Sequence, residues 1–361
     1  MALPFPAPAD PTFTSDDAIA AINADPGFGV HFTDHMALAT WNAGQGWHDG
    51  TVVAYGPFGF GAGGAVYHYA QEIFEGLKAY RHADGSIWLF RPEANATRMA
   101  GSARRLAMPE LPVEDFVAGV RALVALDARW VPSGAEQSLY VRPFMLAAEE
   151  FVGVRPANQV AFCVIASPVG AYFPGGVKPV DIWVCHDASR VATGGTGEAK
   201  CGGNYAASML PQQVAYDHGC SQVLFLDAAT RTRVEELGGM NFGYITAAGE
   251  LVTPELNGNI LAGITRSSLL RIAPRLGLTP IERAVLIEDV FAGIEDGTIS
   301  EVFACGTAAV VTPIGLLRDE FGDHRLPVPG ADSKVLALRE YLVDIQYGRR
   351  ADEFGWMQRV C

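Results

Sequence analysis

The chain has 361 residues and 49% of them are hydrophobic, so it can form more than one packed core and two domains are expected. Its formal net charge of -14 argues against a nucleic acid or an anionic membrane as partner, because either would require a basic face. No apolar run is long enough to span a bilayer and the N-terminus lacks the features of a signal peptide, which favours a cytoplasmic protein.

The first half of the chain predicts two long helices between groups of strands. Residues 1–13 are rich in proline and predict a loose arm, after which Ser15 is placed to cap a short helix. Alternating residues over 29–55 predict antiparallel strands, and apolar residues at helical spacing predict helices over 93–108 and 113–130. Further strands are predicted at SIWLF, SLYVRPFML and QVAFCVIAS.

A break in the pattern separates the two halves. The segment 167–180, SPVGAYFPGGVKPV, is dense in glycine and proline and has no periodicity. We therefore expect a small N-terminal domain of residues 1–166, an interdomain loop of residues 167–180, and a larger C-terminal domain of residues 181–361. The aromatic residues of the loop indicate that it covers something rather than serving as a free linker.

Strands and helices alternate irregularly in the second half. Helices are predicted over 205–218, 263–276, 287–293 and 333–346. Asn204 is placed to cap the first of them, and Pro274 to kink or fray the second. Strands are predicted at DIWVCHD, VLFLDA, MNFGYITA, LVTP, AVLI and EVFACGTAAVVTPI. The absence of a regular β-α-β rhythm predicts mixed α/β or α+β domains rather than a doubly wound sheet.

The six cysteines are widely spaced along the chain. None of them forms a C-x-x-C pair, which disfavours a zinc site and a local redox pair. We expect isolated, reduced thiols and no metal ion.

Lysine is scarce, and one lysine stands in an unusual place. The chain has 4 lysines against 22 arginines, and Lys200 lies within the glycine-rich stretch GGTGEAKCGGNY before a predicted helix. Most lysines are solvated surface charges. An amine, however, can lose its proton and form a Schiff base with a carbonyl, whereas a guanidinium cannot. The scarcity of lysine and the surrounding glycines favour a reactive amine.

Several motifs carry a resemblance to a known family. EAKCGGNYAAS, VEELGGMN, LAGITR and ACGTAAVVTP follow one another in the second half, and YHYAQEIFEGLKAYR, NATRM, SLYVRPF and SPVGAYF in the first. Taken in chain order, over about residues 31–313, these motifs resemble those of the branched-chain amino acid aminotransferases. The resemblance implies the mixed α/β fold of type IV pyridoxal-phosphate enzymes, with a smaller N-terminal and a larger C-terminal domain. It also implies amino-group exchange between L-leucine, L-isoleucine or L-valine and 2-oxoglutarate.

The resemblance assigns three residues to the ring of pyridoxal 5'-phosphate. Lys200 would be the Schiff-base lysine and the general acid and base. Glu236 would hold the pyridine nitrogen protonated, so that the ring acts as an electron sink. By sequence alone Glu235 is its rival, and the plain alternative is that both are surface carboxylates. Tyr205 would contact the phenolic oxygen, with core packing as its alternative.

The cofactor's phosphate requires fixed donors and positive charge. The expected helix N-terminus at 263–265 would supply N–H groups, and Arg98 a bidentate charge. Arg104 and Arg105 compete with Arg98 by sequence but are expected to be surface charges or members of ion pairs. The residues that the resemblance implies as phosphate ligands are Arg98, Ile264, Thr265 and Thr307.

The substrate pocket must accept both an apolar side chain and the γ-carboxylate of glutamate. On the strand SLYVRP, Tyr140 and Arg142 point to one face and resemble the family's carboxylate site. The other residues implied to bind substrate are Tyr69, Phe74 and Tyr172, with the backbone N–H groups of Thr307 and Ala308 for the α-carboxylate. Family sites lie at a dimer interface, so the resemblance implies a homodimer.

The chain departs from the family pattern at four places. Ala262 stands where proline is usual, Cys201 where a bulkier apolar residue is frequent, and Gly239 where some members have a hydroxyl. The thiol redox switch of certain members is absent after Thr307. These departures concern kinetics and regulation, because none of them removes a catalytic group.

Other functions are compatible with parts of the pattern. D-amino acid aminotransferase and aminodeoxychorismate lyase share the fold, but they are expected to lack the FEGLKAYR and YVRP segments. A non-catalytic protein that carries pyridoxal phosphate would not need Glu236. A cofactor-free lysine aldolase would not need separate phosphate-binding elements.

Overall fold

The computed structural model describes residues 2–170 and 177–361. The chain forms two compact units. Unit 1 comprises residues 1–172, 199–202 and 345–361, and unit 2 comprises residues 173–198 and 203–344. The short segment with Lys200 therefore groups with the first half of the chain. The predicted domain division with a loop at 167–180 stays a prediction, although Val169 ends one strand and Val180 begins the next.

Unit 1 is built on an eight-stranded sheet in the order β17-β5-β4-β6-β7-β1-β2, with β3 paired to β6. All its pairings are antiparallel. Its strands are β1 (His35–Asn42), β2 (Gly46–Ala54), β3 (Glu72–Phe74), β4 (Leu77–Arg81), β5 (Ile87–Phe90), β6 (Ser138–Ala147), β7 (Gln159–Val169) and β17 (Met357–Arg359). Its helices are α1 (Asp16–Ala24), α2 (Ala65–Tyr69), α3 (Pro92–Arg105) and α4 (Val113–Leu126), with a 3-10 turn at Ala128–Trp130.

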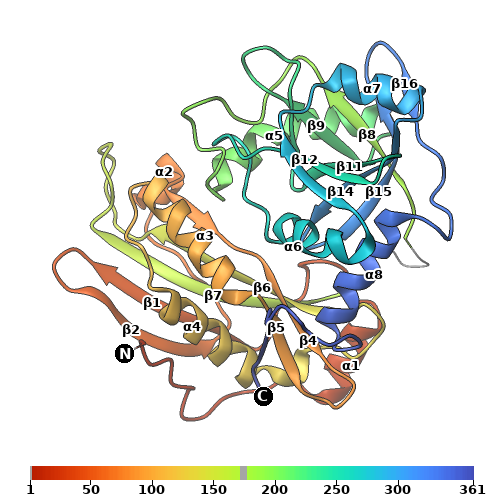
Figure 1. Cartoon of the computed structure of the whole chain (residues 1–361). Coiled ribbons are helices and arrows are strands. Elements are labelled where there is room, and N and C mark those ends of the chain that lie inside the picture. Colours follow the sequence, from red (N-terminus) through yellow and green to blue (C-terminus); the bar gives the residue numbers. More distant parts are fainter. Residues whose placement is uncertain (1, 171–176) are drawn as a thin grey trace. The chain divides into compact units, whose positions relative to one another are not determined.

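Helices α3 and α4 cover one face of this sheet (Figure 1). Phe116 and Leu123 on α4 are buried in the same cluster as Phe162 of β7, which explains the apolar helical spacing that predicted this element. Ser15 caps α1 as predicted, since its hydroxyl accepts the N–H of Ala18 at 3.3 Å.

The prediction of a loose N-terminal arm was wrong. The N–H of Leu3 donates to the Asp115 carboxylate at 2.6 Å, and the carbonyl of Pro6 accepts the N–H of Val52 at 3.0 Å. Leu3 and Phe5 pack against the core of unit 1. The apolar residues between the prolines thus anchor the arm, which proline content alone did not indicate.

Unit 2 has a nine-stranded sheet in the order β10-β9-β8-β15-β14-β11-β12-β13, with β16 paired to β15. An additional pairing of β10 with β11 joins six of these strands into a closed ring. Its strands are β8 (Val180–Cys185), β9 (Gln222–Leu226), β10 (Val234–Leu237), β11 (Asn241–Thr246), β12 (Glu250–Pro254), β13 (Thr279–Arg283), β14 (Ile299–Gly306), β15 (Val310–Arg318) and β16 (Asp323–Arg325). Its helices are α5 (Gly202–Asp217), α6 (Ile264–Ile272) and α7 (Ile287–Glu295), and α8 (Lys334–Gln346) ends in unit 1.

Two local predictions in the second half were wrong. Asn204 does not cap α5 but lies inside its first turn, where its side chain exchanges hydrogen bonds with Thr196 at 2.7 and 2.8 Å. The segment AVLI, residues 284–287, is not a strand. It connects the edge strand β13 to α7. A run of apolar residues did not distinguish a buried connection from a strand.

All six cysteines are free, and five of them are buried. Within residues 2–170 and 177–361, no helix combines the length and the apolar character needed to cross a membrane.

Candidate active site

Lys200 is held against unit 1 by its own backbone. Its N–H donates to the hydroxyl of Ser102 on α3 at 2.9 Å, and its carbonyl accepts the N–H of Phe74 at 2.9 Å. The Nζ atom lies 4.7 Å from the centroid of the Phe74 ring. Helix α3 and strand β3 therefore fix the backbone of the segment. The side-chain amine of Lys200 lies near the ring of Phe74, and aromatic rings attract cations.

The environment of Lys200 increases the fraction of its amine that is neutral. Burial lowers the pKa of Lys200 to about 8, and the positive charge of Arg98 acts in the same direction. The charge of Glu75 opposes this shift. At pH 7 about one tenth of such an amine is unprotonated, against less than about a thousandth for an ordinary lysine. The predicted nucleophile thus has the chemistry that attack on a carbonyl requires.

Arg98 is fixed by a buried carboxylate. Its Nε and Nη2 atoms donate to the two oxygens of Glu75 at 2.8 and 2.7 Å. Its competitors behave as predicted. Arg104 pairs with Glu110 at the surface, and Arg105 is exposed. Of these three arginines, Arg98 is the one whose charge acts on Lys200.

Tyr140 and Arg142 share one face of β6, as predicted. The Nη2 atom of Arg142 donates to the Tyr140 hydroxyl at 3.1 Å, and its guanidinium lies 4.7 Å from the centroid of the Phe74 ring. Its Nε atom is buried without a hydrogen-bond partner among the residues described. A buried donor of this kind can bond to a water molecule or to a bound anion.

One further aromatic residue of the predicted pocket, Tyr69, lies among the described residues. Tyr69 ends α2, is 39% exposed and donates its hydroxyl to the carbonyl of Val152. Tyr172 lies outside the described residues. Their assignment to the substrate pocket stays a prediction.

In unit 2, Glu236 is buried and held by three donors. Arg190 contributes Nη2 at 2.5 Å, Asn241 its side-chain nitrogen at 3.0 Å, and Leu261 its backbone N–H at 3.1 Å. The sheet explains part of this, because Glu236 on β10 pairs directly with Asn241 on β11. These donors give the buried carboxylate the pairing that a charge removed from water requires.

Sequence reasoning missed Arg190. It stands ten residues before Lys200, outside the motif EAKCGGNYAAS, and no spacing rule points to it. Besides pairing with Glu236, it donates to the carbonyls of Asn259 and Gly197 at 2.5 and 3.2 Å. It therefore links Glu236 to two loops of unit 2.

Glu235 has a different environment. It is also buried, at 1% exposure against 4% for Glu236, so the alternative that both are surface carboxylates was wrong. One of its oxygens accepts from the Asn259 side chain at 2.6 Å, and burial raises the pKa of Glu235. Adjacent strand residues point to opposite faces. The ion pair with Arg190 favours Glu236 over Glu235 for the predicted role beside the cofactor ring.

The N-terminus of α6 lies beside the partner of Glu236. Gly263 precedes the helix, and Ile264 and Thr265 are buried in its first turn. The side-chain oxygen of Asn241 occupies the place where a side chain at Gly263 would begin. A helix N-terminus presents N–H groups and a positive dipole end, which suits an anion.

The turn with Thr307 and Ala308 belongs to the same end of the sheet. It follows β14, and Cys305 on that strand pairs with Asn241. Both residues of the turn are partly exposed.

Tyr205 is partly buried on α5. This helix packs close to Gly238 after β10, because Ser208 lies 3.8 Å from the Cβ position there. The predicted residues of unit 2 thus lie on neighbouring elements.

Replacing Gly263 by alanine is expected to weaken cofactor binding. The new methyl group would collide with Asn241 and displace the amide that donates to Glu236. Losing one hydrogen bond to a charged group corresponds to roughly 10- to 100-fold in affinity. Titration of the apoprotein with pyridoxal 5'-phosphate, followed by absorbance, measures the change. Gly322→Ala is the control, because a side chain there meets open space, and an equal loss in both variants would contradict the argument.

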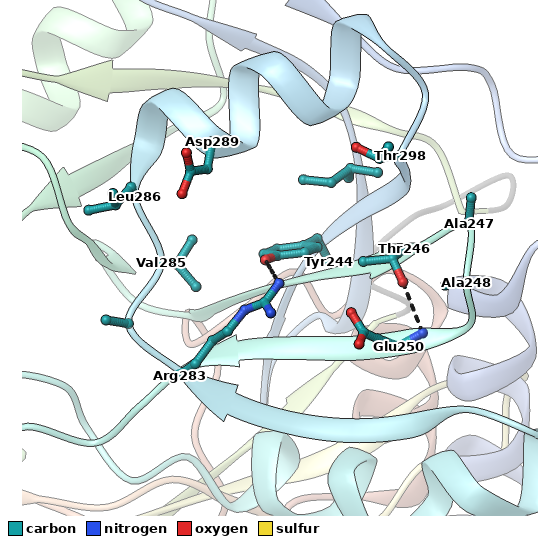
Figure 2. A pocket seen from close by; sticks show the side chains of 12 residues that line it. Tyr244, Thr246, Ala247, Ala248, Glu250, Arg283, Val285, Leu286, Asp289 and Thr298 are labelled. Atoms are coloured by element: carbon teal, nitrogen blue, oxygen red, sulfur yellow. Dashed lines mark hydrogen bonds between the residues drawn. The ribbon is translucent and has the colours of Figure 1, made fainter.

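A separate cavity of about 710 Å³ lies elsewhere in unit 2, between β11 to β13 and α7 (Figure 2). Arg283 donates to the Tyr244 hydroxyl at 3.0 Å inside it, and Glu250 donates its N–H to Thr246. None of the predicted site residues lines this cavity. The reactive groups predicted from the sequence are therefore not located there.

Comparison with known proteins identifies the family. The model of the class IV amino-transferases matches residues 72–317. The probable branched-chain-amino-acid aminotransferase of Streptomyces coelicolor is 54% identical over 348 residues, 96% of each chain. The chain belongs to the branched-chain-amino-acid aminotransferase family. The branched-chain-amino-acid aminotransferase of Mycolicibacterium smegmatis is 49% identical over 99% of this chain and 98% of its own.

Solved structures agree with the family assignment. The T.th. branched-chain amino acid aminotransferase with pyridoxamine 5'-phosphate has a TM-score of 0.74 and 26% identity, over 90% of this chain and 99% of its own. The Escherichia coli branched-chain amino acid aminotransferase has a TM-score of 0.70 and 24% identity over 90% and 99%, which concerns the fold. The predicted mixed α/β fold of a type IV aminotransferase is confirmed.

Proposed function

We propose that the protein transfers amino groups between L-leucine, L-isoleucine or L-valine and 2-oxoglutarate. The products are the branched-chain 2-oxo acids and L-glutamate, and the reaction is reversible. The observation that carries this proposal is the placement of Lys200, whose backbone bonds to Ser102 and Phe74 and whose amine shares the Phe74 ring with Arg142. The names of relatives 49% and 54% identical to this chain support the substrate class.

The residues present fit pyridoxal 5'-phosphate as cofactor. The cofactor requires an amine for its aldehyde, a carboxylate for its pyridine nitrogen and an anion site for its phosphate. The chain supplies Lys200, the buried Glu236 and the N-terminus of α6 for these tasks. When bound, the cofactor supplies an aldehyde and an electron sink. Structures of the T.th. enzyme, which is 26% identical to this chain, are described with pyridoxamine 5'-phosphate and with N-(5'-phosphopyridoxyl)-L-glutamate.

Each residue has a defined task in this proposal. Lys200 captures the cofactor through its neutral amine and moves the proton at the substrate Cα. Glu236, paired with Arg190, holds the proton on the pyridine nitrogen. Tyr205 contacts the phenolic oxygen. The phosphate is bound by Arg98, Ile264, Thr265 and Thr307.

The substrate site combines apolar and cationic groups. Phe74, whose ring already contacts the charges of Lys200 and Arg142, lies at its centre. Arg142 and the hydroxyl of Tyr140 bind the second carboxylate of glutamate, and aliphatic side chains contact the aromatic rings. Tyr69 and Tyr172 complete the pocket, and the N–H groups of Thr307 and Ala308 bind the α-carboxylate. A homodimer in the cytoplasm is part of the same proposal.

A substrate panel tests the proposal. Purified protein is incubated with 2-oxoglutarate and L-Leu, L-Ile, L-Val, D-Ala or an aromatic amino acid, and glutamate formation is measured. We expect turnover of the three branched-chain L-amino acids and none of D-Ala. Preferences among the three are expected within about 200-fold, because one methylene changes binding in an apolar pocket by about 1–3 kcal/mol. Turnover of D-Ala without L-Leu would refute the proposal.

A further inference from the structure

Glu75 carries a buried charge to which none of the tasks above assigns a role. It follows the last residue of β3 and has no exposed surface. Its backbone N–H donates to the carbonyl of Pro143 on β6 at 2.7 Å, which fixes its position. A buried carboxylate is strongly unfavourable unless it is paired and hydrogen-bonded. Its partners therefore show what the position does.

The side-chain partners come from one side of α3, and the backbone N–H of Gly76 also donates to Oε2 at 3.3 Å. Arg98 donates to both oxygens of Glu75, from Nε at 2.8 Å and from Nη2 at 2.7 Å. Asn95, one turn earlier, donates its side-chain nitrogen to Oε2 at 2.7 Å. A bidentate pair uses two of the five N–H bonds of the guanidinium and fixes its plane. Glu75 thus sets the direction of the Arg98 side chain.

Glu75 also acts on Lys200 through its charge. The charged and titratable groups of unit 1 that act on the amine are Arg98 from α3, Glu75 after β3, and Tyr140 and Arg142 from β6. The two arginines disfavour the ammonium, whereas Glu75 and Tyr140 favour it. Glu72 lies nearby, since its carboxylate accepts the N–H of Gly202.

We propose that Glu75 is a positioning residue of the cofactor site, which aims Arg98 at the phosphate and offsets the charge of Arg98 at Lys200. This inference rests on the proposed function, in which Arg98 binds the phosphate and Lys200 captures the aldehyde. It explains why a carboxylate is buried beside a cation that must bind an anion. Without Glu75, the guanidinium would lose the two bonds that fix its plane here, and its full charge would act on the amine.

The experiment uses full-length apoprotein and two probes, pyridoxal 5'-phosphate and pyridoxal. Capture is followed by absorbance as a function of pH. In the wild type the midpoint of capture is expected near the pKa of Lys200, about 8. In Glu75→Gln the loss of a negative charge disfavours the ammonium, so the midpoint shifts to lower pH. Affinity for pyridoxal 5'-phosphate falls roughly 10- to 100-fold, the effect of one charged hydrogen bond, while affinity for pyridoxal changes little.

Two further variants sharpen the test. Glu110→Gln is the matched control, because Glu110 forms the same two-bond pair with Arg104 on α3 at 2.9 and 2.8 Å, but at the surface. It should bind both probes as the wild type does. Glu75→Asp keeps the charge but shortens the side chain. Its midpoint should stay near that of the wild type, while its preference for the phosphorylated probe decreases. This variant carries the test if Glu75→Gln does not fold.

The outcomes separate the inference from the function on which it rests. An unchanged midpoint and an unchanged ratio of the two affinities in Glu75→Gln, or an unchanged ratio in Glu75→Asp, would overturn the role of Glu75. Capture by Lys200 would still stand in that case. A wild-type protein that shows no absorbance shift with pyridoxal 5'-phosphate would instead refute the proposed function itself.

Discussion

Replacing Lys200 by alanine is expected to reduce transamination of L-leucine with 2-oxoglutarate on the order of 10⁴-fold or more. The amine has two tasks, capture of the cofactor and proton transfer at the substrate Cα, and alanine can do neither. The same variant should lose the absorbance shift that pyridoxal 5'-phosphate produces in the wild type. Steady-state kinetics and a cofactor titration measure the two effects on one preparation.

Lys334→Ala is the control for this variant. Lys334 is exposed at the start of α8, and its backbone N–H donates to Glu301 at 2.7 Å, a bond that alanine retains. The control should retain wild-type rates. If Lys200→Ala still transaminated L-leucine at a comparable rate, Lys200 would not be the reactive amine.

Replacing Glu236 by glutamine is expected to lower kcat about 10²- to 10³-fold, the usual effect of removing one preorganised electrostatic group. A neutral amide cannot hold the proton on the pyridine nitrogen. The side chains of Arg190 and Glu236 are only 5% and 6% exposed, so the variant leaves a buried guanidinium without its counter-charge. Breaking such a pair destabilises a fold by about 3–5 kcal/mol. Kinetics and urea unfolding measure the two effects.

Glu235→Gln is the matched comparison for Glu236→Gln. The two glutamates are adjacent on β10 and both are buried, but Glu235 bonds to Asn259 and burial raises its pKa. Its replacement by a neutral amide should therefore change kcat little. If Glu235→Gln were the more damaging substitution, the roles of the two residues would have to be exchanged.

The sequence motifs point to the proposed reactive residues but not to the residues that support them. Lys200 and Glu236 lie in motifs of fixed spacing, and the alternation of β6 is enough to place Tyr140 and Arg142 on one face. Arg190 lies outside these motifs, and Glu75 lies within FEGLKAYR but received no task from the sequence. Each acts through an ion pair with a residue distant in sequence, Arg190 with Glu236 and Glu75 with Arg98. Long-range pairs of this kind depend on the fold and leave no local periodicity.

The predictions of helices and strands also differ in accuracy from one element to another. Helices with a clear apolar face, such as α4, and strands with strong patterns, such as β7, were found near their true limits. The errors at Asn204 and at 284–287 concern single turns, where competing local hydrogen bonds decide the outcome. Strand β17 was missed because its three residues are too few to show a period, and its partner β5 lies far away in the sequence.

The pairing of β17 with β5 has a consequence for how the protein is made. Residues 345–361 belong to unit 1, and the N–H of Val360 donates to the carbonyl of Ile87 at 2.7 Å. While these residues are still inside the ribosome, β5 is an open edge strand, which is prone to pair with other chains. Unit 1 can therefore complete its sheet only after unit 2 has been synthesised. Chaperone demand during translation should fall on the first half of the chain.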